Sequence, residues 1–557
     1  MARKRKIVAV DCETDPFLKD RVPEPFIWGA YDGLDFTVYD DAGELIEAFR
    51  DKYVYMFAHN GGKFDFMFLL RYIDETRARI IKSRIVEFKI GNAIFRDSWS
   101  IIPIALREYR KDEIEYWKLE RQHRKKHRAE ILSYLQTDCI SLYELVDRYF
   151  SAVGKKSTIA SNALAFARGQ GIDVGRTNRH YDGRFRPFYY GGRCEAFKAG
   201  EFRNVNTFDI VSAYPYAMVH KHPTGTEFEN ATTLKGLSDD QIKRSFIDLT
   251  CVSDGAFPTS TKSGLSFPAI LGRFNITGWE FLAAKKHNLI RHEKINSVFT
   301  FNKTIDFKPY VDHWFKVKQD GKENGNKADY IIGKIMMNSL YGKLAQNPIH
   351  YCDYKIYPAG TTIDFENGWR LDRCFDDLEL HARDALYHIK KRAEAANDDW
   401  EKYPIHYNVA TGASITGFTR AHLLDAIHTV GADKVIYCDT DCIFCLPGAD
   451  TFALRQDGKL GSWEWEGTAT PAIIAGKKLY ALEFINGPAA AKANPVKIRA
   501  KGAPEQKVKM DDIRSLVNNM DDPDFSIPFS FDAPTFSVGN KPSFLVRKLR
   551  ATAHLKP

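Results

Sequence analysis

Two short apolar runs near the three-quarter point of the chain are separated by a pair of acids, Asp439 and Asp441. The segment Val435–Cys445 has the pattern of a β-hairpin, and the two carboxylates are predicted to lie at its tip. Neighbouring carboxylates among β-branched and aromatic residues resist ionisation unless a cation lies between them. The pattern therefore favours a divalent metal ion and phosphate chemistry. A polar turn between two strands is the alternative.

A second strand-like run, Thr207–Pro215, contains another acid, Asp209. Between the two acidic segments lies a helical pattern, Ile331–Lys343, which places polar and aromatic side chains on one face. On that face Lys334 would hold a triphosphate, and Tyr341 would pack against a base or sugar. A core helix with a snorkelling lysine would produce the same pattern. The residues that share the face are Lys334, Asn338, Tyr341 and Ala345.

Four motifs in this order resemble those of family B DNA polymerases. Asp209–Pro215 resembles D-x-x-S-L-Y-P, and Lys334–Gly342 resembles K-x-x-x-N-S-x-Y-G. Tyr437–Cys442 resembles Y-x-D-T-D-S, and Lys478–Tyr480 fits K-x-Y. The sequence departs from the family pattern beside the acids, where Ala213 replaces a leucine and Cys442 a serine.

The resemblance implies a nucleotidyl-transfer site with two Mg²⁺ or Mn²⁺ ions. Asp209 and Asp441 would ligate the ions with help from the Val211 carbonyl, and Asp439 would lie beside them. Tyr214 matches the residue that excludes a ribose 2′ hydroxyl. The implied nucleotide-binding residues are Val211, Tyr214, Lys318, Lys334, Asn338 and Tyr341.

The N-terminal third carries a separate group of acids. Strand alternation in Lys6–Thr14 places Asp11 and Glu13 on one face. Asp65 ends a segment that follows the apolar strand Tyr53–Ala58. The helical pattern Ala129–Val146 sets Tyr134 and Asp138 four residues apart on one face.

These segments resemble, in order, the three motifs of the DEDD 3′-5′ exonucleases, which precede the polymerase region in family B enzymes. The resemblance implies that the four carboxylates bind two further metal ions and that Tyr134 orients the attacking water. Lys111 would assist exonuclease catalysis. The implied metal ligands here are Asp11, Glu13, Asp65 and Asp138.

Further matches concern DNA. Tyr189–Arg193 fits a Y-x-G-G motif that joins exonuclease to polymerase and contacts template, and its paired glycines allow the backbone to approach phosphate. Other segments match single-strand contacts of the exonuclease, and the K-x-Y match adds two residues implied to bind DNA. The DNA-binding residues implied are His59, Asn60, Phe64, Ser98, Tyr116, Tyr189, Gly191, Gly192, Lys478 and Tyr480.

Long segments that do not have the composition of linkers separate Pro215 from Lys334 and Gly342 from Tyr437. These two insertions resemble terminal-protein regions 1 and 2 of the protein-primed branch, and the compact length resembles tectivirus replicases. The resemblance implies that the first insertion docks a priming protein, for which we expect a role of Lys285, Lys286 and Arg291. The second insertion would encircle DNA and support processive strand displacement.

The expected fold is therefore α/β and α+β multidomain, with an RNase H-like exonuclease domain followed by a right-hand polymerase. The expected boundaries are 1–175 for the exonuclease domain, 176–226 and 407–505 for the palm, 227–315 for terminal-protein region 1, 316–346 for the fingers, 347–406 for terminal-protein region 2, and 506–557 for the thumb.

Composition agrees with this outline without specifying it. The chain has 557 residues, of which 44% are hydrophobic, enough for several cores. A formal charge of +8 permits a polyanionic partner. Scattered cysteines favour reduced thiols in a cytoplasmic setting, the host cytoplasm if the protein is viral. The absence of a long apolar run argues against export or a membrane span.

The partners that the resemblance implies are DNA template and primer strand, dNTPs, a terminal (priming) protein and a single-stranded DNA-binding protein. The enzyme is expected to act as a monomer. A DEDD exonuclease or DNA-binding relic should have lost some of the motif acids, yet all are present. A primer-independent or linear-plasmid polymerase of the same branch would share every motif, so that alternative stays open.

Overall fold

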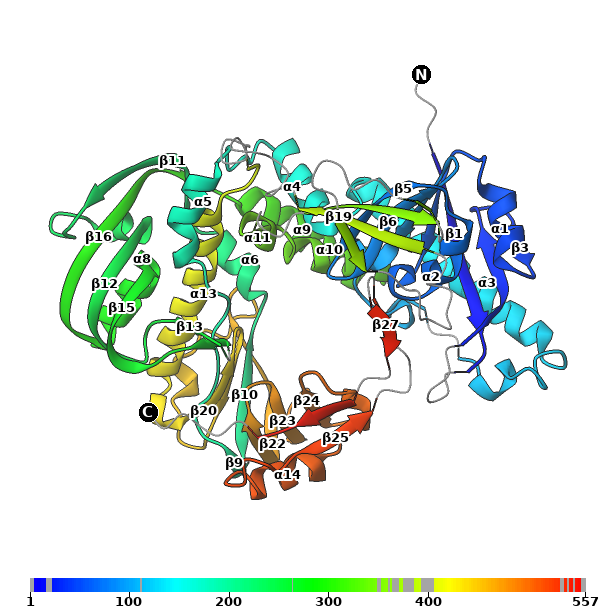
Figure 1. The fold of residues 1–557 in the computed structure, drawn as a ribbon. Helices are drawn as coiled ribbons and strands as arrows, with labels where there is room; N and C mark the ends of the chain where they lie inside the picture. The colour runs from blue at the N-terminus through cyan, green and yellow to red at the C-terminus, as the bar shows by residue number, and fades with distance from the viewer. Residues whose placement is uncertain are drawn as a thin grey trace.

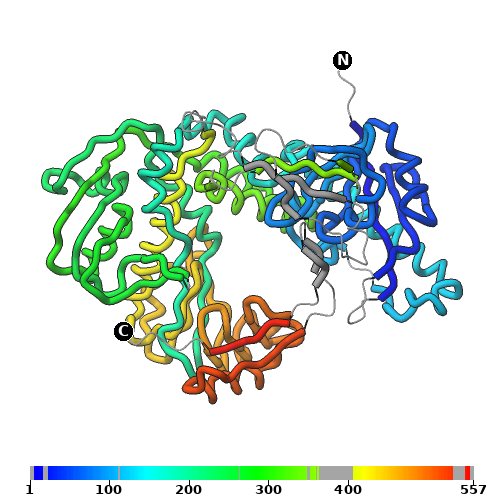
Figure 2. The backbone as a smooth tube through the Cα atoms, in the orientation of Figure 1, coloured from blue at the N-terminus to red at the C-terminus, as the bar shows by residue number. Residues whose placement is uncertain are grey.

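A computed structural model describes most of the chain. The described residues are 5–16, 23–110, 113–262, 264–347, 352–358, 361–362, 370–373, 385–391, 405–530, 535–537, 540–543 and 546–551. Figures 1 and 2 show the N-terminal domain on one side of the molecule and the first insertion on the opposite side, with helices between them along the top and the palm strands and C-terminal part below.

The N-terminal domain is built on a mixed sheet whose central strands β1 (Lys6–Thr14), β4 (Val54–Ala58) and β7 (Ala93–Asp97) are parallel. Antiparallel strands β2 (Pro25–Tyr31) and β3 (Phe36–Tyr39) extend one side, and β6 (Arg84–Ile90) and β5 (Thr76–Ile81) extend the other. Helix α3 (Arg128–Ala152) packs against β1 and β2. These elements confirm the strands and the helix predicted from the sequence.

Shorter helices complete the N-terminal domain and its connection to the palm. Helix α1 (Ala42–Phe49) covers the sheet, and α2 (Asp65–Leu69) follows β4. Helices α4 (Ile159–Gly169) and α5 (Arg179–Phe185) lead toward the palm.

The second insertion extends the same N-terminal sheet. Its strand β17 (Cys352–Pro358) pairs antiparallel with β5, and β19 (Ala385–Lys391) and β18 (Arg370–Arg373) follow outward, so the sheet has ten strands among the described residues. Ile356 of β17 is fully buried in the core of the N-terminal domain. Two segments far apart in sequence thus share one sheet and one core.

The palm is an antiparallel sheet in the order β24-β23-β22-β10-β21-β20-β8, with β9 (Gly200–Phe202) beside β22. Its central strands are β10 (Val205–Ile210), β21 (Cys442–Cys445) and β20 (Val435–Asp439). Strands β22 (Trp463–Gly476), β23 (Leu479–Asn486) and β24 (Val496–Ala500) lie on one side, and β8 (Cys194–Ala196) is the opposite edge. The hairpin predicted at Val435–Cys445 is confirmed.

Helix α13 (Val409–Thr429) covers one face of the palm sheet and is buried around most of its circumference. A helix that is buried all round needs small or apolar side chains in every direction. Helix α6 (Ala213–Met218) follows β10 and packs against α13.

The first insertion forms a separate antiparallel sheet in the order β11-β16-β12-β15. Its strands are β11 (His222–Ala231), β12 (Ser245–Asp254), β15 (Ala269–Thr277) and β16 (Ile290–Ile305). Helix α7 (Asp239–Lys243) and helix α8 (Gly278–Lys286) pack on it, and α8 also packs on α13. A small hairpin of β13 (Thr259–Thr261) and β14 (Gly264–Ser266) reaches toward the palm (Figure 1).

Two packed helices, α9 (Lys308–Glu323) and α10 (Lys327–Met337), occupy the place expected of the fingers. The helix predicted through Lys343 is wrong in its continuity, because α10 ends at Met337 and α11 (Leu340–Leu344) begins after two residues. Asn338 and Ser339 donate side-chain hydrogen bonds to the carbonyls of Lys334 (2.9 Å) and Ile335 (2.5 Å). Such local bonds compete with helix continuation.

The C-terminal part packs on the outer palm strands. It contains α14 (Met510–Asn518), β25 (Ile527–Ser530) paired with β28 (Val546–Leu549), and β26 (Thr535–Ser537) paired with β27 (Asn540–Ser543). Three expected boundaries fall inside regular elements: 226/227 in β11, 315/316 in α9 and 505/506 in the short 3₁₀ helix Glu505–Lys507. No helix in the described ranges combines the length and apolarity needed to cross a bilayer.

The close approach of α9 and α10 depends on Gly333. A Cβ atom there would lie 2.7 Å from the Lys318 nitrogen and 2.8 Å from the Trp314 carbonyl oxygen, both backbone atoms that cannot swing away. We expect Gly333→Ala to destabilise the protein by about 1–3 kcal/mol, measured by thermal unfolding.

Gly183 of helix α5 provides the matched control, because a Cβ atom there meets nothing within 4 Å. Gly183→Ala should leave stability unchanged or raise it by about 0.5–1 kcal/mol. Equal melting temperatures for the two variants would contradict the close packing of α9 on α10.

Candidate functional site

The predicted polymerase acids lie in one row across three palm strands. Asp209 of β10 is opposite Cys442 of β21, and Cys442 is opposite Asp439 of β20. Residues directly opposed in antiparallel strands point to the same face. That face is the one turned away from α13, and Asp441 lies at the adjoining hairpin tip. We call Asp209, Asp439 and Asp441 the palm acidic cluster.

The hairpin tip has an unusual backbone. Thr440 has φ of +58°, and the Asp441 N–H donates to the Asp439 carbonyl at 2.6 Å. A two-residue bond of this kind around a residue with positive φ is rare and strained, above all for a β-branched residue. The turn brings the two acids on either side of Thr440 close together.

Burial and mutual repulsion disfavour the charged forms of these carboxyls. The pKa of Asp209 is raised to about 7 by burial, then by Asp441 and Glu466, while Lys497 opposes the rise. The pKa of Asp441 is raised to about 6 by burial and by Asp439. The Oδ1 atom of Asp209 is buried and has no hydrogen-bond partner in the described part of the protein. Divalent cations would offset the burial of these carboxyls, screen their mutual repulsion and provide a partner for Asp209 Oδ1.

Asp439 is already matched by a cation of the protein itself. Lys478 Nζ lies 2.5 Å from Asp439 Oδ2, and the Lys478 N–H donates to the Tyr437 hydroxyl at 3.1 Å. Tyr480 packs edge-on against Tyr437 with centroids 5.1 Å apart. The predicted K-x-Y pair therefore adjoins the acids.

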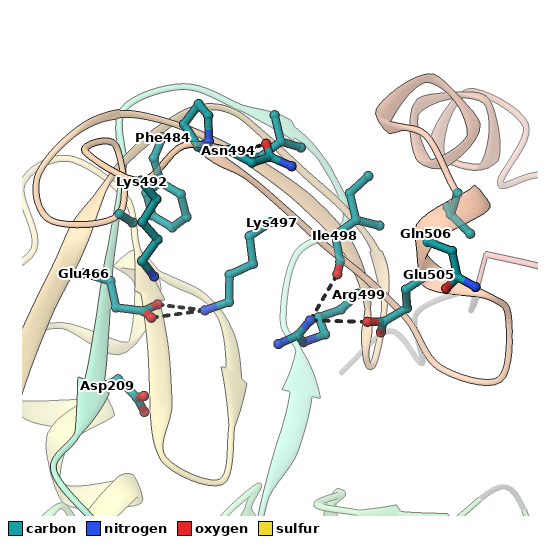
Figure 3. Close-up of a pocket in the computed structure, with 14 residues that line it drawn as sticks. Asp209, Glu466, Phe484, Lys492, Asn494, Lys497, Ile498, Arg499, Glu505 and Gln506 are labelled. Carbon is teal, nitrogen blue, oxygen red and sulfur yellow. Dashed lines mark hydrogen bonds and ion pairs between the residues drawn. The ribbon is translucent and has the colours of Figure 1, made fainter. Parts of the chain in front are cut away.

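A cavity of about 650 Å³ opens beside Asp209 (Figure 3). Lys497 of β24 bridges both carboxylate oxygens of Glu466 at 2.8 and 3.2 Å, and Lys492 and Arg499 also line the cavity. None of these four residues was predicted. The alternation Val496-Lys497-Ile498-Arg499 on a strand is the sequence signal that would have indicated a basic face.

The two tyrosines that were predicted to contact the nucleotide pack against each other. The rings of Tyr214 on α6 and Tyr341 on α11 are stacked, 3.9 Å apart and 14° from parallel. Burial, followed by the neighbouring tyrosine, raises the pKa of Tyr214, and burial raises that of Tyr341 to about 12. The Val211 carbonyl accepts a hydrogen bond from Gly461 N–H at 2.9 Å, which leaves it a second lone pair.

Lys318 and Lys334 project from the paired helices α9 and α10. Burial lowers the pKa of Lys318, and the charge of Lys334 lowers it further, so the two ammonium groups lie near one another. Two adjacent cations suit a polyanionic ligand such as a triphosphate. Asn338 lies at the end of α10, where its exposed amide donates to the Lys334 carbonyl at 2.9 Å.

The structure also brings the N-terminal acids together, and we call Asp11, Glu13, Asp65 and Asp138 the N-terminal acidic cluster. Asp11 and Glu13 come from β1, Asp65 begins α2, and Asp138 lies on α3. Burial, Asp138 and Asp65 raise the pKa of Glu13 to about 8, and burial raises that of Asp65 to about 6.

Two further residues adjoin the N-terminal acidic cluster. The Cys12 thiol donates to Asp65 Oδ1 at 3.3 Å. Burial and then Asp138 raise the pKa of Tyr134. Tyr134 therefore lies beside the acids in its protonated form, as its predicted role requires.

In neither acidic cluster do three side chains of the described residues already enclose a point at metal-ligand distance.

The predicted single-strand contacts divide into available and occupied groups. His59 bonds Ser98 Oγ at 2.9 Å and the Ile104 carbonyl at 2.8 Å, and burial lowers its pKa to about 4. The prediction of Ser98 as a DNA ligand is wrong, because Ser98 is fully buried and its hydroxyl serves His59 and the Ala58 carbonyl. Tyr116 is 66% exposed.

Asn60 and Phe64 occupy the turn between β4 and α2. Asn60 has φ of +62°, and its side-chain oxygen accepts from Arg84 at 2.8 Å. Phe64 packs on Phe68 with centroids 5.2 Å apart. Lys111 lies outside the described residues.

The Y-x-G-G segment is held against the palm by two residues that sequence reasoning missed. Arg420 of α13 donates to the carbonyls of Tyr190 (2.7 Å) and Gly191 (2.8 Å) and pairs with Glu280 of α8 at 2.8 Å. Both charged side chains are only 2% exposed. A single arginine in a long run of small and apolar residues was the available signal.

Comparison with known proteins gives consistent results. Residues 107–430 match the family described as DNA polymerase type B, organellar and viral. The DNA-directed DNA polymerase of Enterobacteria phage PRD1 is 36% identical over 508 residues, which cover 89% of this chain and 85% of that protein. The DNA polymerase of Bacillus phage Nf is 29% identical over 203 residues, or 36% of this chain and 29% of that one.

Solved structures of Phi29 DNA polymerase share the fold. The orthorhombic crystal form has a TM-score of 0.74 at 17% identity, covering 99% of this chain and 100% of that chain. The complex with primer-template DNA and incoming nucleotide has a TM-score of 0.73 at 18% identity with the same coverage. This likeness confirms the predicted fold class.

The raised pKa values predict how metal and pH affect stability. Because the folded-state pKa values of Asp65, Glu13, Asp209 and Asp441 lie above those of the unfolded chain, the metal-free protein binds more protons folded than unfolded between about pH 4 and 8. The contribution of these four carboxyls to folding stability is fully present below this window. It is lost as pH rises through the window, by up to about 1.4 kcal/mol per pH unit for each carboxyl.

Mg²⁺ should therefore raise the melting temperature more at pH 8 than at pH 6, at matched ionic strength, because at pH 8 it relieves charge repulsion. Asp209→Asn should reduce this difference, whereas Asp74→Asn, which changes an exposed carboxylate, should not. An Mg²⁺ effect of equal size at both pH values would contradict the assignment.

Proposed function

The chain belongs to the organellar and viral type B DNA polymerases, and on this premise we propose that it extends DNA from a protein primer and proofreads at a second site. It is a DNA-directed DNA polymerase. One observation carries the proposal: the motif acids gather in two separate clusters, one in the palm and one in the N-terminal domain.

The palm acidic cluster is the proposed site of nucleotide addition. Asp209, Asp441 and the Val211 carbonyl offer oxygen donors that suit Mg²⁺ or Mn²⁺, and the unpartnered Oδ1 of Asp209 supports this fit. Two such ions, when bound, activate the primer 3′ hydroxyl and neutralise the leaving pyrophosphate. Lys478 balances Asp439, which leaves the other two carboxylates for the ions.

The incoming dNTP is proposed to lie between the fingers helices and α6. Lys334 and Lys318 hold the triphosphate, and Asn338 joins them at the end of α10. Tyr214 lies under the sugar and excludes ribonucleotides. Because Tyr214 and Tyr341 are stacked in contact, the nucleotide has to displace one ring or bind at the edge of the pair.

The N-terminal acidic cluster is the proposed 3′-5′ exonuclease site. Its four carboxylates supply only oxygen ligands, which suits two Mg²⁺ or Mn²⁺ ions that activate the attacking water. Tyr134 orients that water, and Lys111 remains a predicted assistant. Asn60, Phe64 and Tyr116 contact the single strand, while His59 holds the strand-binding segment through its two ring nitrogens.

DNA near the polymerase site is proposed to contact Tyr189, Gly191 and Gly192 through the template and Lys478 and Tyr480 through the primer. The carbonyls of Tyr190 and Gly191 accept hydrogen bonds from Arg420. Gly191 is exposed and has no side chain, so a phosphate can approach its backbone.

Domain boundaries are proposed as expected, except that the first insertion begins with β11 and the fingers begin with α9.

Protein priming and strand displacement are proposed from the two insertions, with a priming protein and a single-stranded DNA-binding protein as partners of a monomeric enzyme. The basic residues expected to dock the priming protein are engaged within the chain: Lys285 pairs with Glu293, Lys286 with Asp425, and Arg291 with Asp254. Because each charge already has an acidic partner, in one case on helix α13, we expect these residues to contribute little to docking.

Substitutions test the separation of the two sites. Asp441→Ala should lower nucleotide addition by about 10³-fold or more and leave degradation of single-stranded DNA within about twofold of the parent. Asp11→Ala combined with Glu13→Ala should do the reverse. Primer extension and single-strand degradation are measured on folded variants, and loss of both activities from either change would refute two sites.

Initiation on linear origin DNA tests the protein primer. Synthesis should require a candidate terminal protein and leave the new strand covalently attached to it, which a labelled nucleotide would reveal on a denaturing gel. Efficient initiation without any added protein, on the same template, would instead favour the primer-independent or linear-plasmid alternative.

A further inference from the structure

The strained turn at Thr440 separates the two acids of the catalytic hairpin. A β-branched residue at φ of +58° is costly and persists only where its surroundings leave it no alternative. The bond from Asp441 N–H to the Asp439 carbonyl closes the turn but does not hold the Thr440 amide itself. Something outside the hairpin must fix this residue.

The fixing group is the backbone of Arg193. The Thr440 N–H donates to the Arg193 carbonyl at 2.6 Å, one step beyond the strand pair Asp439 and Cys194. Gly192 lies directly against the Thr440 side chain, since a Cβ atom there would be 2.4 Å from Thr440 Oγ1. The two residues that precede the edge strand β8 thus hold the tip of the hairpin through a backbone hydrogen bond and a close side-chain contact.

The side chain of Arg193 fixes that backbone in turn. Its Nε donates to Glu195 Oε2 at 2.5 Å, and its guanidinium lies 4.3 Å from the ring centre of Phe267. Arg193 is only 5% exposed, and its Nη1 has no partner among the described residues. An unsatisfied buried donor costs free energy, so hydrogen bonding alone does not explain this placement.

Phe267 belongs to the first insertion, not to the palm. It follows β14 and is 7% exposed. Two residues earlier, the Leu265 carbonyl accepts a hydrogen bond from Lys477 Nζ at 3.0 Å, and Lys477 precedes the lysine that pairs with Asp439. The β13–β14 hairpin and the residue pair after it therefore contact both palm segments that border the acids.

We infer that Arg193 is a positioning residue through which the first insertion holds the Thr440 turn, and with it Asp439 and Asp441, in the geometry for nucleotide addition. The inference rests on the proposed polymerase site. Phe267 of the insertion contacts Arg193, and the Arg193 carbonyl binds the Thr440 amide. Because these contacts do not depend on a priming protein, the insertion then has a role in every addition step, besides any role in initiation.

Hydrogen exchange of the metal-free protein tests the link without any activity. In Arg193→Met and Phe267→Leu, the Thr440 amide should exchange about tenfold faster than in the parent, because its acceptor is no longer held. Arg273→Met is the matched control, because it removes an ion-paired arginine of the first insertion whose partner is Asp248 and not a residue of the hairpin or of the Arg193 segment. Its Thr440 exchange should equal that of the parent.

Kinetics supply the second readout. Arg193→Met should lower kcat for nucleotide addition about tenfold with Mg²⁺ and less with Mn²⁺, since Mg²⁺ demands the more regular ligand geometry. The change in KM for primer-template should be smaller than the change in kcat, and the rate of single-strand degradation should stay unchanged. The kcat of Arg193→Lys should lie between those of the parent and Arg193→Met, because lysine keeps the charge but lacks the planar guanidinium group.

Unchanged Thr440 exchange in both Arg193→Met and Phe267→Leu would overturn the inference, as would a kcat equal to that of Arg273→Met. If Arg193→Met does not fold, Arg193→Lys and Phe267→Leu decide by the same measurements. If the parent itself adds no nucleotide, the proposed function fails, while the exchange experiment still decides whether the insertion holds the turn.

Discussion

Like-charged carboxylates approach one another inside a protein only where the backbone forces them to, and both acidic clusters depend on this. In the palm, the register of three antiparallel strands sets Asp209 and Asp439 on either side of Cys442. In the N-terminal domain, β1, α2 and α3 together supply the four acids of one cluster. The packed elements around each cluster, such as the buried helix α13 behind the palm sheet, hold a geometry that electrostatics opposes.

Much of this arrangement could be predicted from short-range patterns. The strand around Asp209, the hairpin around Asp439 and Asp441, and the helix that carries Asp138 all follow from periodicity over about ten residues. The break after Met337 was missed because Asn338 and Ser339 are tolerated inside helices, and only their capping bonds end this one.

Long-range pairings were beyond the reach of periodicity. Nothing local to Arg420 or Glu280 indicates that they meet as a buried ion pair, and nothing near Lys497 indicates that it faces Glu466. The same holds for Ser98, which a motif match assigned to DNA but which the fold encloses completely. A motif fixes which residue types occur, whereas burial decides which of their atoms remain available.

The pairing of β17 with β5 has a consequence for the solution behaviour of the protein. Without the second insertion, β5 would end the N-terminal sheet and present a row of unpaired backbone groups, the kind of edge through which proteins aggregate. Ile356 would also leave an opening in the core of that domain. The insertion is thus a protective cover for its neighbour, and shortened versions of this chain face self-association before any question of processivity arises.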